Sequence, residues 1–396
     1  ADTNSGYRMM PMISNYDDPR ATDPETVEII ISNPTLRHEH VTQIASVASQ
    51  NGYDGIFIDY RDLSDESKDD FTAFIDDLSD SLSDVGLLLG VVVPQATNTT
   101  GDWETGAYDW RELGESVDYF KVRMGINPLN FGPEDNRLVN AMMRWAVDEV
   151  SRYKILMGLS TQSVRDIDGV LTRIGYDEAI AGMGNVVVEA ADISATGSIE
   201  PGTEIRASLD GLDAIAGVDT ILNAPFLDYV DEDGNALARI WLTTDSALSY
   251  RMERTIPFAL AGVAFDDLLV DDIVEGLPQT ILNYKAQVPA APSPTDLALR
   301  WSIEGSGGLY DEVVTGLNED LVVTLAAPDG NYAINIAVVG IGEESESQRT
   351  GAAELTAAFS SFPSVGARWA GSKSMRRSSW AFRATTMVEA DIKIAP

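Results

Sequence analysis

The sequence predicts an α/β fold, with a parallel sheet in residues 1–288 and a smaller all-β region after it. Near-continuous apolar runs alternate with amphipathic segments as far as about residue 285, which is typical of parallel strands covered by helices on both faces. Beyond a proline-rich segment the apolar residues recur with a period of two, as in antiparallel strands. A length of 396 residues suits one large domain and a smaller one.

Six apolar runs are the predicted strands of the parallel sheet. They are Tyr7–Ile13, Gly55–Tyr60, Gly86–Val93, Tyr119–Met124, Lys154–Leu159 and Leu260–Phe265. Helical spacing marks the stretches around residues 38–50, 66–84, 134–150 and 246–258. The second stretch predicts an amphipathic helix, because one of its faces carries only large apolar side chains. These are Phe71, Phe74, Ile75, Leu78 and Leu82.

The alternation of long apolar runs with amphipathic segments stops between Gly175 and about Leu242. Short strand-like runs there predict a small α+β insertion before the last strand of the sheet. Residues 231–235, Asp-Glu-Asp-Gly-Asn, have the composition of a hairpin turn. Residues 289–296 form a proline-rich linker. Residues 297–396 predict a β-sandwich-like domain that ends in a basic strand or arm, because the last thirty residues hold mostly basic charges.

The charge balance is strongly acidic, with 63 acidic and 27 basic residues and a formal net charge of −36. Such a field repels nucleic acid and anionic membranes, and it suits an extracellular or cell-surface protein. No apolar run approaches the roughly 18 residues of a membrane-spanning helix. The chain has no cysteine, and its two histidines, His38 and His40, lack further ligands at zinc spacing. We therefore expect neither a metal nor a cofactor.

Polar and charged residues interrupt the second predicted strand, in the segment Gly52–Asp62, which reads Gly-Tyr-Asp-Gly-Ile-Phe-Ile-Asp-Tyr-Arg-Asp. Strand alternation places residues 56, 58 and 60 on one face, toward the covering helices. The opposite face then carries Phe57, Asp59 and Arg61.

This segment resembles the signature of glycoside hydrolase family 18, whose fourth barrel strand reads Asp-x-x-Asp-x-Asp-x-Glu. The four positions are Asp54, Phe57, Asp59 and Arg61 here. Further segments resemble the family in the same order. They are Tyr7–Asn15, Asn33–Ala48, Leu87–Pro94, Tyr153–Leu159 and Phe226–Ser246. The resemblance covers roughly residues 7–285 and is greatest to a bacterial branch with spore-cortex and cell-wall-associated members. It implies a chitinase-like TIM-type (β/α) barrel with its site at the C-terminal mouth.

Family 18 enzymes hydrolyse glycosides by a substrate-assisted mechanism. The resemblance implies that the final Glu protonates the glycosidic oxygen while the acetamido group of the substrate attacks the sugar. A middle Asp and a later Tyr-Asp pair hold that acetamide. In this chain the acid position is Arg61, which has no proton to give near neutral pH, and the orienting position is Phe57. The chain is therefore expected to be a catalytically degenerate member, a pseudoenzyme.

The other family positions also differ in this chain. By the same resemblance, the Tyr-Asp pair corresponds to Ile126 and Asn127. The aromatic floor of the sugar subsite falls at Phe265 or Asp266. Most of the groups that would hold the acetamide are therefore replaced.

Two signature carboxylates persist, Asp54 and Asp59. We expect Asp59 to pair with Arg61 inside the mouth, because a buried charge needs a partner. Asp62 has the opposite phase, so it could replace the lost acid only if the strand ended early or bulged.

Counted from the fourth strand, the six predicted strands correspond to the third to eighth strands of the family barrel. The resemblance therefore implies that the first two strand–helix units are lacking. We expect the edges of residues 8–13 and 260–265 to be paired by something outside the first six residues, either a second copy or another chain.

Three functions remain open. The first is a non-catalytic, extracellular scaffold or assembly subunit, which the lost acid and the basic C-terminal segment favour. The second is a carbohydrate-binding module for chitin or peptidoglycan. Its candidate ligand-binding residues are Asp59, Arg61, Asn127, Trp103, Trp110 and Phe265. The third is a weakly active glycosidase with a relocated acid.

Overall fold

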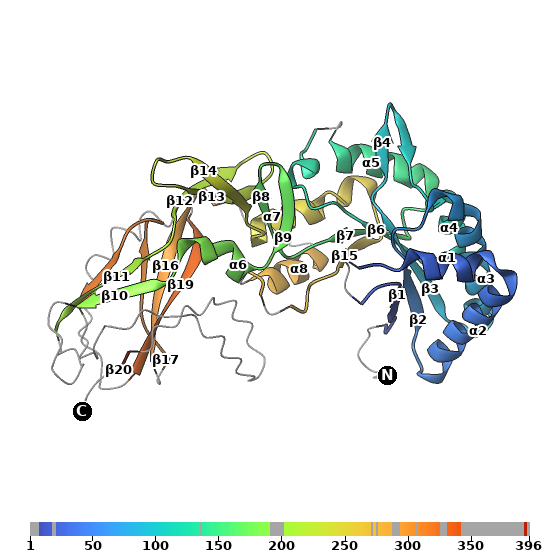
Figure 1. Ribbon diagram of the computed structural model, residues 1–396, viewed down its shortest axis with the longest axis horizontal. Coiled ribbons are helices and arrows are strands. Elements are labelled where there is room, and N and C mark those ends of the chain that lie inside the picture. The colour runs from blue at the N-terminus through green and yellow to red at the C-terminus, as the bar shows by residue number, and fades with distance from the viewer. Residues whose placement is uncertain are drawn as a thin grey trace. The chain divides into compact units, whose positions relative to one another are not determined.

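The computed structural model describes residues 8–17, 21–134, 137–190, 202–270, 272–274, 276–286, 294–305, 308–324, 331–341 and 392–393. The chain folds as two compact units (Figure 1). The first comprises Ala1–Gly125, Leu129–Leu159 and Arg251–Asp266, and the second Ile126–Pro128, Ser160–Tyr250 and Asp267–Pro396. Most of the predicted linker, residues 289–293, lies outside the described residues.

A six-stranded parallel sheet forms the centre of the first unit, with its strands in chain order. They are β1 (Met12–Ser14), β2 (Gly55–Asp59), β3 (Leu88–Pro94), β6 (Tyr119–Arg123), β7 (Ile155–Leu159) and β15 (Gly262–Phe265). Each overlaps one of the predicted runs. Within the described residues β1 pairs only with β2 and β15 only with β7, so each outer strand has one free edge.

Helices follow the strands of this sheet, and α1 to α4 lie together beside β1–β3 (Figure 1). The helices are α1 (Pro24–Ser32), α2 (Pro34–Gln50), α3 (Lys68–Ser83), α4 (Trp110–Ser116) and α5 (Leu138–Glu149). A 3₁₀ turn, Asp65–Ser67, precedes α3. The prediction for this helix is confirmed, because all five residues of its apolar stripe are fully buried. A short hairpin of β4 (Thr97–Thr99) and β5 (Asp102–Glu104) follows β3.

Capping residues set the starts of α1 and α2. The carboxylate of Asp23 accepts a hydrogen bond from the backbone N–H of Thr26, and the amide oxygen of Asn33 accepts from the N–H groups of Thr35 and Leu36. A proline occupies the first position of each helix, where its missing N–H costs no hydrogen bond. The two helices therefore begin at defined points after β1.

Antiparallel strands dominate the second unit. A five-stranded sheet has the order β12-β13-β14-β8-β9, and a three-stranded sheet the order β10-β11-β18. The strands are β8 (Ser163–Ile167), β9 (Val170–Ile174), β10 (Val186–Ala190), β11 (Glu204–Leu209), β12 (Asp213–Asp219), β13 (Ala224–Val230), β14 (Ala236–Trp241) and β18 (Leu321–Thr324). Helices are α6 (Tyr176–Ile180) and α8 (Leu277–Lys285), while α7 (Asp245–Glu253) contributes residues to both units.

The insertion begins earlier than the predicted Gly175. Strands β8 and β9 already form an antiparallel hairpin before that residue. Its turn residues, Asp168 and Gly169, have φ values of 53° and 83°. Asp-Gly between two apolar runs is the usual sequence of such a turn, because both residues tolerate positive φ. The predicted hairpin turn at residues 231–235 is confirmed between β13 and β14.

The C-terminal strands lie where the period-two pattern predicts them. The remaining strands are β16 (Asp296–Gly305), β17 (Gly308–Thr315), β19 (Asn331–Ile341) and β20 (Ile392–Lys393). They form a sheet of order β17-β16-β19-β20. The rest of the basic segment after Arg368 lies outside the described residues.

The insertion and the C-terminal strands share one hydrophobic core instead of forming separate domains. Leu227 of β13 belongs to the same cluster as Trp301 of β16 and Ile334 of β19. Strand β18 pairs with β11 of the insertion. A sheet with one apolar face needs another layer to bury it, and each of these two segments supplies that layer to the other.

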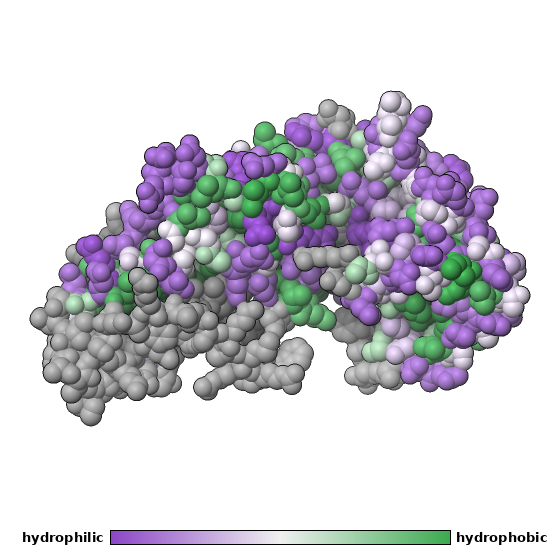
Figure 2. Space-filling view, in the orientation of Figure 1, coloured by the Kyte–Doolittle hydropathy of each residue, from purple (hydrophilic) through white to green (hydrophobic). Residues whose placement is uncertain are grey.

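Hydrophilic residues cover much of the visible surface of both units (Figure 2), in keeping with the net charge of −36. No helix in the described ranges is both long enough and apolar enough to cross a membrane.

Candidate functional site at the carboxyl end of the parallel sheet

Strand β2 presents different residues on its two faces, as the alternation predicts. Toward the helices, Ile58 and Tyr60 are buried. The ring of Tyr60 stacks on Phe74 of α3 with a centroid distance of 5.7 Å, and its hydroxyl lies 2.6 Å from Nε2 of His40 in α2. Burial lowers the pKa of His40, which favours its neutral form.

Phe57 occupies the inward face of β2. Its ring stacks with Tyr119 of β6 at a centroid distance of 6.0 Å. Gly90 of β3 lies between these two residues in the strand register, and a Cβ atom there would be 2.4 Å from the Phe57 ring. The missing side chain of Gly90 therefore makes room for the Phe57 ring on the inward face.

Asp59 lies at the centre of a polar network on the same face and is almost completely buried. Arg61 donates to its carboxylate from Nε at 3.1 Å and from Nη2 at 2.6 Å. Arg123 donates from Nη1 at 3.1 Å, and the Tyr16 hydroxyl donates at 2.6 Å. The predicted pairing of Asp59 with Arg61 is confirmed. A carboxylate has about four lone-pair sites, so these donors occupy Asp59 fully.

The chain after β1 holds Arg61 in place. The amide of Asn15 bonds the backbone of Arg61 in both directions, at 2.9 and 3.0 Å. The guanidinium carbon lies 4.1 Å from the centre of the Tyr16 ring, and Nη2 donates to the Tyr16 hydroxyl at 2.6 Å. This ring contact and these hydrogen bonds fix the plane of the guanidinium.

Both Tyr16 and Arg61 retain their protons in this network. Burial and the hydrogen bond to Asp59 raise the pKa of Tyr16 above its usual value. Burial lowers the pKa of Arg61, but the hydrogen bond and attraction to Asp59 outweigh it, so the net shift is upward. Neither group releases a proton near neutral pH.

A second ion pair lies on the inward face, between the buried Lys121 of β6 and Asp266, which directly follows β15. Asp266 also attracts Arg61 electrostatically. Arg61 and Arg123 therefore share the carboxylate of Asp59, whereas Lys121 pairs with Asp266.

Sequence reasoning missed Tyr16, Lys121 and Arg123. The signal was available in Tyr119–Arg123, where basic residues alternate with apolar ones in a strand expected to be buried. Charged residues are rarely buried without partners. The position of Lys121 and Arg123 on the inner face of a buried strand was therefore a signal for the site. Tyr16 follows the short strand β1 and carried no comparable pattern.

Two candidate aromatic residues pack within the first unit. Trp110 is buried, with its ring against Phe120 and Trp145 at centroid distances of 5.2 and 5.0 Å. This corrects the expectation that Trp110 binds a sugar, because no ring face is free. Trp103 stacks one face on Trp145 at 5.6 Å and is only partly buried.

The remaining candidates do not join the Asp59 network. Phe265 is in register with Leu159, which places it on the outward face of the sheet, whereas Asp266 takes the inward position. Asn127 belongs to the second unit. The carboxylate of Asp54 accepts a hydrogen bond from the backbone N–H of Met9 at 2.6 Å, a contact that orders the start of β1.

Strand β2 ends at Asp59, which is earlier than the sequence suggests. Asp62 then has a φ of 58° and is exposed, and the Thr22 hydroxyl donates to its carboxylate at 2.7 Å. The early end of the strand frees Asp62 from the alternation of β2.

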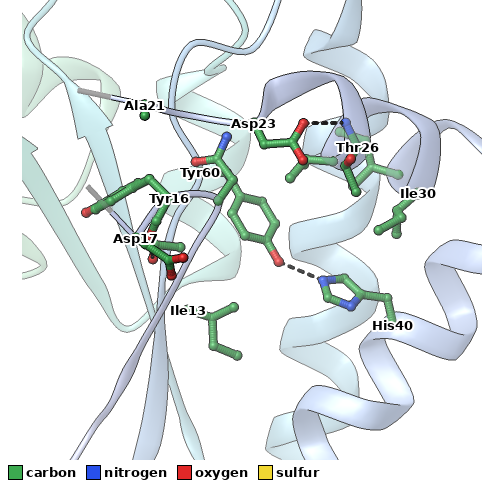
Figure 3. Close-up of a pocket in the computed structure, with 13 residues that line it drawn as sticks. Ile13, Tyr16, Asp17, Ala21, Asp23, Thr26, Ile30, His40 and Tyr60 are labelled. Atoms are coloured by element: carbon green, nitrogen blue, oxygen red, sulfur yellow. Dashed lines mark hydrogen bonds between the residues drawn. The ribbon is translucent and has the colours of Figure 1, made fainter. Parts of the chain in front are cut away.

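A cavity of about 470 Å³ is lined by the end of β1, by α1 and α2, and by Asn15 and Tyr16 of the Asp59 network. Figure 3 shows the Tyr60 hydroxyl and the His40 ring meeting in it, with Ile13 and Ile30 among its apolar residues. Asp23 and Asp17 also line it, and Asp23 is already bonded as the cap of α1. This cavity lies on the helix-facing side of β2 and excludes Asp59 and Arg61 from its lining.

Comparison with known proteins matches residues 1–166 to the model of glycosyl hydrolases family 18. A Bacillus subtilis protein named as a sporulation-specific glycosylase is 25% identical over 244 residues, which cover 60% of this chain and 52% of that protein. The cortical fragment-lytic enzyme of Bacillus subtilis is 21% identical over 270 residues, covering 65% and 56%. The chain thus spans about half the length of these curated relatives.

Solved structures extend the similarity to the fold. A chitinase from Chromobacterium violaceum superposes with a TM-score of 0.52 at 17% identity, covering 70% of this chain and 79% of that one. The crystal structure of the sporulation-specific glycosylase from Bacillus subtilis gives a TM-score of 0.50 at 20% identity, covering 65% and 80%. Together with the parallel sheet, these similarities identify a TIM-type barrel fold.

Proposed function

Because residues 1–166 belong to glycosyl hydrolase family 18, we propose that this chain is a non-catalytic member that acts as an extracellular scaffold or assembly subunit. One observation carries the proposal. At the position of the family's general acid, Arg61 forms an ion pair with the buried Asp59.

The chemistry of the network opposes hydrolysis by the family mechanism. A positioned general acid contributes about 10²–10⁴ in rate. Arg61 stays protonated, and four donor groups hold the Asp59 carboxylate. The Phe57 ring provides no acceptor for the acetamide N–H. Both the acid and the group that orients the nucleophile are therefore lacking.

An activity assay tests the first part of the proposal. We expect no turnover of chromogenic N-acetylglucosaminides or of peptidoglycan fragments by the native chain. Arg61→Glu alone should also stay inactive, because Phe57 still cannot orient the acetamide. Turnover by the native chain that Asp62→Asn abolishes would instead establish the relocated-acid glycosidase.

The free edges of the parallel sheet support an assembly role. Strands β1 and β15 each pair with one strand among the described residues, and unpaired edges readily add a strand from another chain. Met12 of β1 is 43% exposed, although it belongs to a sheet strand. The acidic surface and the net charge of −36 suit an extracellular setting.

Light scattering after size exclusion tests the assembly role. We expect the native chain to form defined oligomers, and Met12→Lys to shift them toward monomer, because a charge on an edge strand opposes pairing. Val47→Lys is the matched control, since Val47 is 50% exposed on α2. A native chain that stays monomeric at high concentration, in low and high salt, would refute the role.

A polysaccharide ligand is the second candidate, which membership of family 18 favours. Of the two candidate tryptophans only Trp103 can still stack on a sugar, since Trp110 is buried. The charges on the inward face of the sheet bear on this candidate more directly.

A further inference from the structure

We propose that Arg61 and Arg123 bind a carboxylate carried by a sugar, an acidic saccharide such as a uronic acid. The proposal reverses the charge of the family site, in which carboxylates face the ligand. It deepens the polysaccharide-binding candidate, and it requires neither hydrolysis nor assembly.

The ion pairs on the inward face use few carboxylates. Asp59 is shared by Arg61 and Arg123, and Asp266 is paired with Lys121. Among the described residues the two arginines therefore share a single carboxylate. A partly buried charge of this kind is costly unless an opposite charge approaches it.

Several N–H groups of Arg61 and Arg123 are left over after the bonds to Asp59 and Tyr16. Arg61 uses Nε and Nη2, and Arg123 uses Nη1, in the hydrogen bonds to Asp59 and Tyr16. Nη1 of Arg61 and both Nε and Nη2 of Arg123 have no acceptor among the described residues. The two side chains are 15% and 21% exposed, so each is partly open to solvent.

The geometry of a guanidinium favours a carboxylate as the bound anion. A guanidinium presents parallel N–H groups that match the two oxygens of a carboxylate. Tyr16 fixes the plane of Arg61, so less side-chain freedom is lost on binding. The negative field of the whole protein does not prevent this contact, because salt screens charges beyond about 8 Å at physiological ionic strength.

Isothermal titration with D-glucuronate and D-glucose tests the proposal, because the two sugars differ by one carboxylate. We expect saturable binding of glucuronate and no binding of glucose at the same concentrations. Arg123→Gln should weaken glucuronate binding by roughly tenfold, which corresponds to about 1.4 kcal/mol. This substitution keeps the Arg61–Asp59 pair, and a thermal melt verifies the fold.

Arg111→Gln is the matched control, since Arg111 forms its ion pair with Glu149 outside the site. Glucuronate affinity that Arg123→Gln leaves unchanged would overturn the site. Equal binding of acetate and glucuronate would overturn the sugar ligand, because the site would then recognise any carboxylate. The titration measures sugar binding, whereas light scattering measures assembly and the activity assay measures hydrolysis. Absence of glucuronate binding is therefore distinct from failure of the proposed function.

Discussion

The two faces of strand β2 hold their neighbours by different means. Toward the helices, Ile58 and Tyr60 are buried among large apolar rings. The polar contacts of Tyr60 there are its hydroxyl with His40 and its carbonyl oxygen, which accepts from the Tyr108 hydroxyl. Toward the inside of the sheet, Asp59 is equally buried but is held by four charged or hydroxyl donor groups.

This difference shows what constrains substitution on each face. The outward face is constrained by packing density, so a smaller side chain there leaves a void and a larger one clashes. The inward face is constrained by ion pairing, because the buried Asp59 needs the donors of Arg61 and Arg123.

Truncation on the outward face should have the largest effect. Phe74 is fully buried between Tyr60 and Phe71. We expect Phe74→Ala to lower the free energy of unfolding by about 3–5 kcal/mol, because it removes a ring and leaves a cavity. Urea denaturation measures the change, with Val47→Ala on exposed α2 as the control. Equal effects of the two substitutions would contradict the comparison.

Removing the central charge of the inward face should cost somewhat less. Asp59→Asn leaves Arg61 and Arg123 facing each other without their shared carboxylate. We expect a loss of about 2–3 kcal/mol, below the value for a fully buried pair because both arginines keep some contact with water. Added sulfate should restore part of the melting temperature. A stability unaffected by the substitution would show that the network has no structural role.

The fit between Phe57 and Gly90 provides a third test. A methyl group on Gly90 would overlap the Phe57 ring, so Gly90→Ala should destabilise by about 1–3 kcal/mol. Phe57→Leu in the same chain should relieve most of that cost, because a smaller side chain makes room for the methyl. Additive effects in this double-mutant cycle, measured by urea denaturation, would show that the two residues do not constrain each other.

The smallest effect is expected from pH, on the outward face. Burial lowers the pKa of His40 in the folded state, so the unfolded chain binds the proton more readily. The contribution of His40 is then fully present above its unfolded pKa of about 6.5 and is lost as pH falls toward the lower folded pKa. Thermal melts between pH 8 and pH 5 should show a steeper loss for the native chain than for His40→Gln. The control is His38→Gln, since His38 is exposed on the same helix.

Much of the first unit was predictable because its signals are local. The six strands overlap the six apolar runs, and the stripe of α3 is buried as predicted. The Asp59–Arg61 pair followed from alternation and from the need of a buried charge for a partner. The start of the insertion was predicted too late, although Asp168-Gly169 marks the earlier hairpin.

The rest of the site depended on segments far apart in the chain. Arg123 lies 64 residues after Asp59, and Asp266 lies 145 residues after Lys121. The burial of Trp110 depended in the same way on its packing against Trp145 of α5.

The sequence by itself determined the strand periodicity of the parallel sheet and the placing of Asp59 and Arg61 on one face of β2, because both depend on residue type and spacing along one segment. Only the tertiary structure decided which charges meet on the inward face and that the insertion shares a core with the C-terminal strands. Such contacts join residues far apart in the chain, and their energy depends on strand register and burial, which local patterns do not specify.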